Sequence, residues 1–184
     1  MVRPGLALYG LGPRPEMGEG LRPALSLFTQ VIFLKDHPSG RPIGYGREHT
    51  TSRRTRIATL PVGYNDGYPY RLSGKGEVLI RGRRAPVVGR VSMDYTMVDV
   101  GALPGVSSGD DVVLIGGSGE ERIGALELAD RSGTIIYEIL TGIGKRVARV
   151  YTSREPRAAV EPASPRGFRL IRRPDSSDEA PVRR

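Results

Sequence analysis

A chain of 184 residues has the length of about one domain with some additional material, and its 38% of hydrophobic residues is enough for one buried core. The chain contains no cysteine and only two histidines, His37 and His49, which excludes disulfides and thiolate metal sites and argues against a histidine metal cluster. Because no apolar run approaches about 18 residues and the N-terminus lacks an apolar signal segment, we expect a cytoplasmic protein without a membrane span.

The net charge of +8 makes nucleic acid one partner to consider. The positive charge is nearly all arginine, since lysine occurs only at Lys35, Lys75 and Lys145. The arginines are scattered, many fall near the C-terminus, and no zinc-finger, RNP-type or helix-turn-helix pattern accompanies them. We therefore expect neither a nucleic-acid partner nor a membrane partner, and charge remains the only support for an arginine-driven nucleic-acid binder.

The 25 glycines and 15 prolines favour short strands and turns over long helices. Residues 6–11 form an apolar run entered by Pro-Gly and left by Gly-Pro, which predicts one buried strand and its exit loop. Residues 25–36 predict a strand that is apolar on both faces and therefore covered on both sides. Further strand patterns, separated by turn residues, lie at 56–64, 77–82, 84–100 and 111–117.

Helical spacing appears late in the chain, at residues 123–133, where Gly133 predicts a helix end, and again at 134–147. Residues 146–151 predict a last short strand. From residue 152 to 184 the chain is rich in proline, arginine and acidic residues with few apolar ones, which predicts a disordered tail. Many short strands with turns between them indicate a mainly β fold, a small barrel-like arrangement with one or two short helices.

Three tyrosines stand in unusual settings: Tyr45 between two glycines, Tyr64 at the end of a strand pattern, and Tyr137 in a helical pattern. A tyrosine can act as a base only if nearby positive charge lowers its pKa from about 10. Arg47 is close to Tyr45 in sequence, and Arg90 is a candidate to approach it in space. Each tyrosine taken alone is nevertheless better explained by ordinary packing or, for Tyr45, by a glycine turn.

Several motifs occur together and in order: "VRPGLALYGL", "GYGR", "GYNDGYP", "VGRVSMD", "GDDVVLIG" and "TIIYEIL" followed by "RVARVY". This series, which spans residues 1–151, resembles the alanine racemase family, whose cofactor is pyridoxal phosphate. The resemblance implies interconversion of L- and D-alanine, with D-alanine supplied for peptidoglycan. It also implies a homodimer, or pairing with a barrel-containing chain, in which two subunits share each site.

The resemblance assigns roles to single residues. Tyr45 matches the catalytic tyrosine, an acid and base that the family delivers across the dimer interface. Tyr64 matches a tyrosine at the substrate entrance, and Met93 matches the residue whose backbone amide meets the substrate carboxylate, with Asp94 beside it. At Tyr70 many relatives have an arginine, and Arg71 follows directly.

The cofactor residues implied by the resemblance lie at both ends of the matched region. Arg3 matches the arginine that bonds the pyridine nitrogen, which keeps that nitrogen unprotonated and weakens the cofactor as an electron sink. Gly5 and Leu6 match backbone donors to the cofactor phosphate. Tyr137 matches a tyrosine that bonds the same phosphate.

The resemblance also divides the chain. Residues 1–22 match the last strand of the family's α/β barrel and its exit loop, residues 23–151 match its C-terminal β domain, and residues 152–184 form the tail. None of the three lysines matches the lysine that carries the cofactor, so we expect this chain alone to be inactive. The alternative is a non-catalytic dimerisation or binding module derived from a racemase. Alanine, serine and lysine racemases share these motifs, so the substrate is not decided by them.

Overall fold

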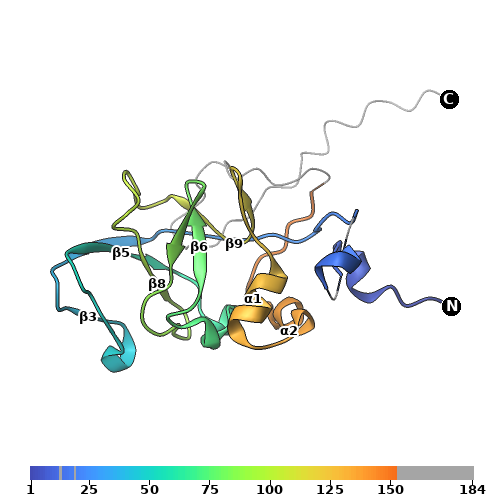
Figure 1. Cartoon of the computed structure of the whole chain (residues 1–184), viewed down its shortest axis with the longest axis horizontal. Helices are drawn as coiled ribbons and strands as arrows, with labels where there is room; N and C mark the ends of the chain where they lie inside the picture. Colours follow the sequence, from blue (N-terminus) through green and yellow to red (C-terminus); the bar gives the residue numbers. More distant parts are fainter. Residues whose placement is uncertain (13, 19, 153–184) are drawn as a thin grey trace.

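The structure is a computed structural model that describes residues 1–12, 14–18 and 20–152. Figure 1 shows a mainly β body, with two short helices on one side of it and the N-terminal segment at the right. The predicted disordered tail lies outside the described residues, apart from Thr152. The mainly β class with two α-helices is confirmed.

The larger sheet holds five strands, all paired antiparallel, in the order β1-β9-β6-β7 with β10 paired to β9. Its central strand β9 is buried from Val112 to Gly116, because its apolar run is covered on both faces. Leu79 of β6 lies opposite Val113 of β9. The strands are β1 (Leu27–Gln30), β6 (Glu77–Ile80), β7 (Arg83–Pro86), β9 (Asp111–Ser118) and β10 (Glu121–Ile123).

A second sheet of three strands has the order β2-β5-β8, and a two-stranded hairpin joins β3 to β4. The predicted single strand at 25–36 is divided between the two larger sheets. Val31 N donates to Asp110 O and Ile32 N donates to Thr59 O, so the chain changes pairing partner between these residues. These strands are β2 (Phe33–His37), β3 (Pro42–Ile43), β4 (His49–Thr50), β5 (Thr55–Leu60) and β8 (Thr96–Asp99).

The barrel-like arrangement that we expected is looser than a barrel, because the sheets formed by the described residues do not close on themselves. The apolar pattern at 84–100 does not form one strand. It forms β7 and β8, with a loop between them and one isolated bridge from Val87 to Val98. Pro86 ends β7, in keeping with the inability of proline to donate to a sheet.

The predicted strand at residues 6–11 is wrong, because this run forms the 3₁₀ helix η1 (Gly5–Tyr9). Pro4 precedes it with a helical φ of −66°, and Gly10 ends it with a φ of 67° while its N–H donates to Ala7 O. Leu6 is buried in the main core whereas Leu8 is 73% exposed. A second 3₁₀ helix, η2 (Pro15–Gly18), follows.

The two predicted helices are present as α1 (Ala125–Ser132) and α2 (Ile136–Gly142), and Gly133 ends α1 with a φ of 66°. The predicted strand at 146–151 is wrong. Val147 N donates to Gly144 O in a turn, and the Arg149 guanidinium donates to nearby carbonyl groups of its own segment, so this backbone has local partners. Three further 3₁₀ helices lie in loops: η3 (Tyr45–Arg47), η4 (Tyr64–Asp66) and η5 (Tyr70–Leu72).

Within the described part of the chain, none of the helices combines the length and the apolar character that crossing a membrane requires. The main core contains buried residues of the five-stranded sheet, of β5 and β8 in the three-stranded sheet, and of α1 and α2.

Candidate functional site

Two loops that carry predicted site residues are held side by side. Tyr64 N donates to Ser92 O at 3.0 Å and Asn65 N donates to Met93 O at 3.1 Å, which joins η4 to the loop before β8. A Cβ at Gly63 would lie 2.3 Å from Met93 O, so only glycine allows this approach. Tyr64 and Met93 are therefore brought together, and both side chains are about half exposed.

Asp66 connects these loops to a third segment. Its carboxylate is buried, accepts a hydrogen bond from Gly63 N at 2.9 Å and accepts two from Arg146, at 2.7 and 3.2 Å. Arg146 also donates to Asp94 at 2.6 Å. The hydrogen bond to Asp66, followed by that to Asp94, raises the pKa of the Arg146 guanidinium. One arginine after α2 thus holds both loops in place.

The backbone strengthens this connection. Gly144 N donates to Asp66 O at 2.9 Å, and Gly67, with a φ of 99°, passes so close to the end of α2 that a Cβ there would lie 2.3 Å from Gly142 O. Tyr64 also packs edge to face on Tyr70, with ring centroids 6.4 Å apart and an interplanar angle of 75°. The result is an exposed aromatic surface on a rigid base.

Tyr45 lies elsewhere, in the turn between β3 and β4. Its side chain is 74% exposed, and the turn uses positive φ angles at Gly44, Gly46 and Arg47. Arg90, from the loop that follows β7, forms an ion pair with Glu48 at the end of this turn. Arg90 thus approaches the turn that carries Tyr45 at Glu48, and its approach to the Tyr45 ring itself stays a prediction.

The remaining predicted residues form another group. Arg3 is exposed, Gly5 begins η1 with a φ of 55°, and Leu6 is buried in the core. Tyr137 lies on α2 and is about half exposed. In Figure 1 the N-terminal segment and α2 occupy the right side of the molecule, while the turn after β3 lies at its left end. The predicted site residues are thus divided among three regions: the loops of Tyr64, Met93 and Asp94, the turn of Tyr45, and the N-terminal segment with α2.

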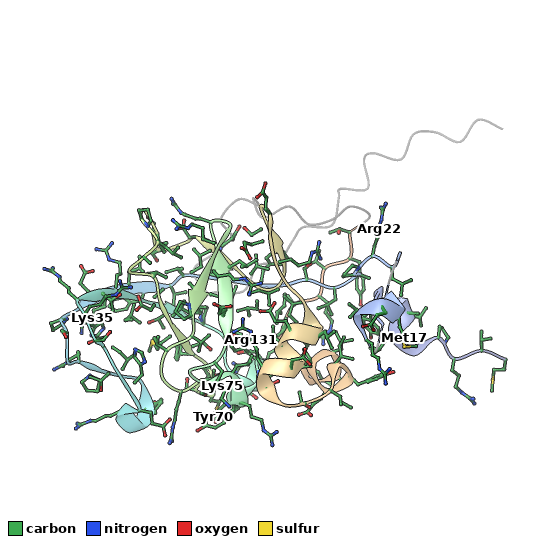
Figure 2. The ribbon with its side chains drawn as sticks, viewed as in Figure 1. Met17, Arg22, Lys35, Tyr70, Lys75 and Arg131 are labelled. Atoms are coloured by element: carbon green, nitrogen blue, oxygen red, sulfur yellow. The ribbon has the colours of Figure 1, made fainter. Side chains whose placement is uncertain are left out.

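Two shallow grooves lie near these regions. One, of about 630 Å³, is mixed in charge and is lined by Glu48, Tyr70, Arg71, Ser73, Lys75 and residues 130–133. Figure 2 shows Tyr70 and Lys75 near the lower edge of the molecule, with Arg131 above them. The other, of about 210 Å³, lies over β2 and β5 beside Ile43 and is mainly apolar. No group of acidic or histidine side chains among the described residues is arranged to hold a metal ion.

The sequence motifs did not predict Arg146 or Glu48 as parts of this arrangement. Arg146 lies in a run that we interpreted as a strand, and it is 80 residues from Asp66 in sequence. Asp66 and Arg90 belong to the matched motifs, but the resemblance gave them no specific role. Only the acidic and basic character of these positions hinted at an ion pair.

Known proteins are similar to this chain over most of its sequence. The family model described as "Alanine racemase, C-terminal domain" matches residues 24–151. The curated alanine racemase of Symbiobacterium thermophilum is 54% identical over 153 residues, which are 82% of this chain and 41% of that protein. The alanine racemase of Halothermothrix orenii is 49% identical over 156 residues, 84% of this chain and 41% of that protein.

Solved structures agree. The alanine racemase of Bacillus anthracis with bound L-Ala-P has a TM-score of 0.76 and 43% identity, over 86% of this chain and 41% of that one. The alanine racemase of Bartonella henselae with covalently bound pyridoxal phosphate has a TM-score of 0.73 and 36% identity, over 80% of this chain and 40% of that one. The chain thus spans about two fifths of the length of these relatives. It belongs to the alanine racemase family, of which it represents the C-terminal portion.

Proposed function

We propose that this chain supplies the C-terminal domain of a pyridoxal-phosphate-dependent alanine racemase, which interconverts L- and D-alanine and provides D-alanine for peptidoglycan. The observation that carries the proposal is that the loops of Tyr64 and Met93 are held together by the Asp66–Arg146–Asp94 network. The chain that holds this network belongs to the alanine racemase family. In this proposal residues 23–151 are the C-terminal domain, and residues 1–22 belong to the end of the barrel.

The N-terminal residues fit a cofactor phosphate. Gly5 and Leu6 are the first residues of η1, and the first N–H groups of a helix have no acceptor within it. A Cβ at Gly5 would meet no described atom within 4 Å, so space beside the backbone is open. Tyr137 presents an exposed side chain from α2 for the same phosphate. Bound there, pyridoxal phosphate would supply an electron sink for charge at the substrate α-carbon, and Arg3 would hydrogen-bond its ring nitrogen.

Tyr45 is the proposed acid and base. In one direction the Tyr45 phenolate would take the proton of the substrate α-carbon, whose electron pair stays on the carbon, and in the other direction the phenol would give the proton back. The exposed position of Tyr45 makes the phenol accessible to another subunit. Because the turn that carries it lies at the other end of the molecule from the N-terminal segment, we assign these two groups to different active sites of a homodimer or of a pair with a barrel-containing chain.

Met93 and Tyr64 serve the substrate in this proposal. The Met93 carbonyl is occupied by Asn65 N, which fixes the orientation of the loop backbone and directs the neighbouring peptide groups. The Met93 N–H binds the substrate carboxylate, and Asp94 is held beside it by Arg146. Tyr64, stacked on Tyr70, forms part of the entrance.

None of the three lysines of this sequence matches the lysine that carries the cofactor in the alanine racemase family. Lys35 lies on β2, Lys75 follows η5, and Lys145 follows α2. We therefore expect residues 1–184 to form no stoichiometric borohydride-trapped adduct with pyridoxal phosphate, and no D-alanine, when tested alone. A single adduct at one lysine together with D-alanine formation would contradict this expectation.

The direct test is complementation. The chain is co-expressed with a full-length alanine racemase whose own matching catalytic tyrosine is changed to phenylalanine, and the co-purified complex is assayed for D-alanine. We expect activity with the wild-type chain and none with Tyr45→Phe, which serves as the matched control. A complex that forms but stays inactive with the wild-type chain would refute the catalytic role and favour the non-catalytic binding module.

A further inference from the structure

The turn of residues 44–48, here called the Tyr45 turn, has few internal constraints. The strands on either side of it, β3 and β4, pair over only two residues each. Three of its residues, Gly44, Gly46 and Arg47, have φ angles of 72°, 74° and 55°. A left-handed conformation is unfavourable for a non-glycine residue such as Arg47. Glycine accounts for two of these angles, so Arg47 is the residue of the turn whose conformation its own residue type disfavours.

Arg90 contacts the turn from outside. Its guanidinium donates to the Glu48 carboxylate, and this hydrogen bond is the main reason that the pKa of Arg90 is raised. A Cβ at Gly46 would lie 3.1 Å from Arg90 Cζ and 3.3 Å from its Nε. The guanidinium therefore occupies the space that a side chain at position 46 would need. Arg90 contacts the turn both by charge and by packing.

The backbone near Arg90 also approaches the turn. A Cβ at Gly89 would lie 2.9 Å from Ile43 O, and a Cβ at Gly44 would lie 3.6 Å from Arg90 N. Arg90 Nε is buried and has no hydrogen-bond partner among the described residues, although the outer part of the side chain is exposed. The inner part of the guanidinium is therefore packed against the protein, while its ion pair with Glu48 is exposed to solvent.

We propose that Arg90 is a positioning residue, which holds the Tyr45 turn and so fixes the location of the Tyr45 phenol. Arg90 acts through Glu48 and Gly46 and does not itself need to contact the substrate. This proposal rests on the proposed function in one respect, since the proposed function is what assigns the acid and base role to Tyr45. The contact between Arg90 and the turn lies within one chain and does not depend on that assignment.

The test measures order in the turn by nuclear magnetic resonance on the 184-residue chain. Backbone order parameters of residues 44–48 and the ¹⁹F line width of a fluorotyrosine at position 45 are compared in wild type, Arg90→Gln and Glu48→Gln. We expect backbone order parameters of about 0.85 in the wild-type turn, as in rigid backbone. In both variants we expect these order parameters to fall below about 0.6. Arg81→Gln, which breaks the ion pair with Asp110 in another loop, is the matched control and leaves the turn ordered.

Rescue distinguishes positioning from general stability. Exchanging the charges, Arg90→Glu together with Glu48→Arg, restores an ion pair but not the packing against Gly46. We expect the exchanged pair to recover order only in part. An ordered turn in both single variants would overturn the proposal, and Glu48→Gln keeps this outcome available if Arg90→Gln fails to fold. Such a result would leave the proposed function intact. If complementation fails while the turn is disordered in both single variants, the proposed function is refuted and the positioning role is kept.

Discussion

The buried carboxylate of Asp66 provides the sharpest test of how the loops are held. In Asp66→Asn the side-chain shape is retained, but its amide has one acceptor oxygen where the carboxylate has two. One group among Gly63 N–H and the two Arg146 donors then faces an NH₂ group. Losing one hydrogen bond to a charged group and leaving a buried donor unpaired costs about 2–3 kcal/mol of unfolding free energy.

That loss lowers Tm by about 8 °C for a domain of this size. Urea unfolding followed by circular dichroism measures the free energy, with the slope of the transition as a check on two-state behaviour. The matched control is Asp36→Asn, because Asp36 accepts two hydrogen bonds from Arg56, at 2.8 and 3.0 Å, on an exposed surface. We expect no measurable change for the control. Equal stability of Asp66→Asn and wild type, or equal losses in both variants, would refute the argument from burial.

Three further predictions concern single positions. Tyr68→Phe is expected to raise stability by about 1 kcal/mol, because the Tyr68 hydroxyl is buried, has no partner among the described residues, and has a pKa raised by that burial; a loss of stability in urea would contradict this. Gly63→Ala is expected to lose at least about 2 kcal/mol because its Cβ would meet backbone, whereas Gly142→Ala, which meets no described atom within 4 Å, should be tolerated. The pKa of His37 is lowered by burial and then by nearby cations. The unfolded state therefore binds the proton more readily, and stability falls as pH drops through about 6.5. His37→Gln should flatten the dependence of stability on pH in this range, and an unchanged slope would show that His37 is not its source.

Much of the fold could be predicted from local patterns. The apolar alternation and turn residues predicted most strands within a few residues, and glycine placement predicted the end of α1. The division of residues 25–36 could not be predicted, because both Val31 and Ile32 are apolar and only pairing with distant segments separates β1 from β2. Pro4 before η1 and Gly10 after it are residues typical of a helix start and a helix end. We nevertheless predicted a strand there, because the apolar run between them is short.

The candidate site was predictable to a different extent. The motifs led to Tyr64 and Met93, which the structure places on adjoining loops, and their roles in catalysis stay predictions. Tyr45 lies at the tip of a hairpin and is largely exposed, and its reach into another subunit stays a prediction. The part played by Arg146 could not be predicted, since an ion pair between residues 80 positions apart depends on the whole fold.

The attachment of the site to the segment after α2 limits how far this polypeptide can be shortened. A version that ended at Ile143 would keep every described strand and both α-helices, and circular dichroism would report a nearly unchanged secondary structure. It would nevertheless lack the Gly144 N–H that Asp66 O accepts and the guanidinium that joins Asp66 to Asp94. Boundaries for expression or crystallisation are therefore better drawn beyond Arg149, whose side chain closes this last turn on itself.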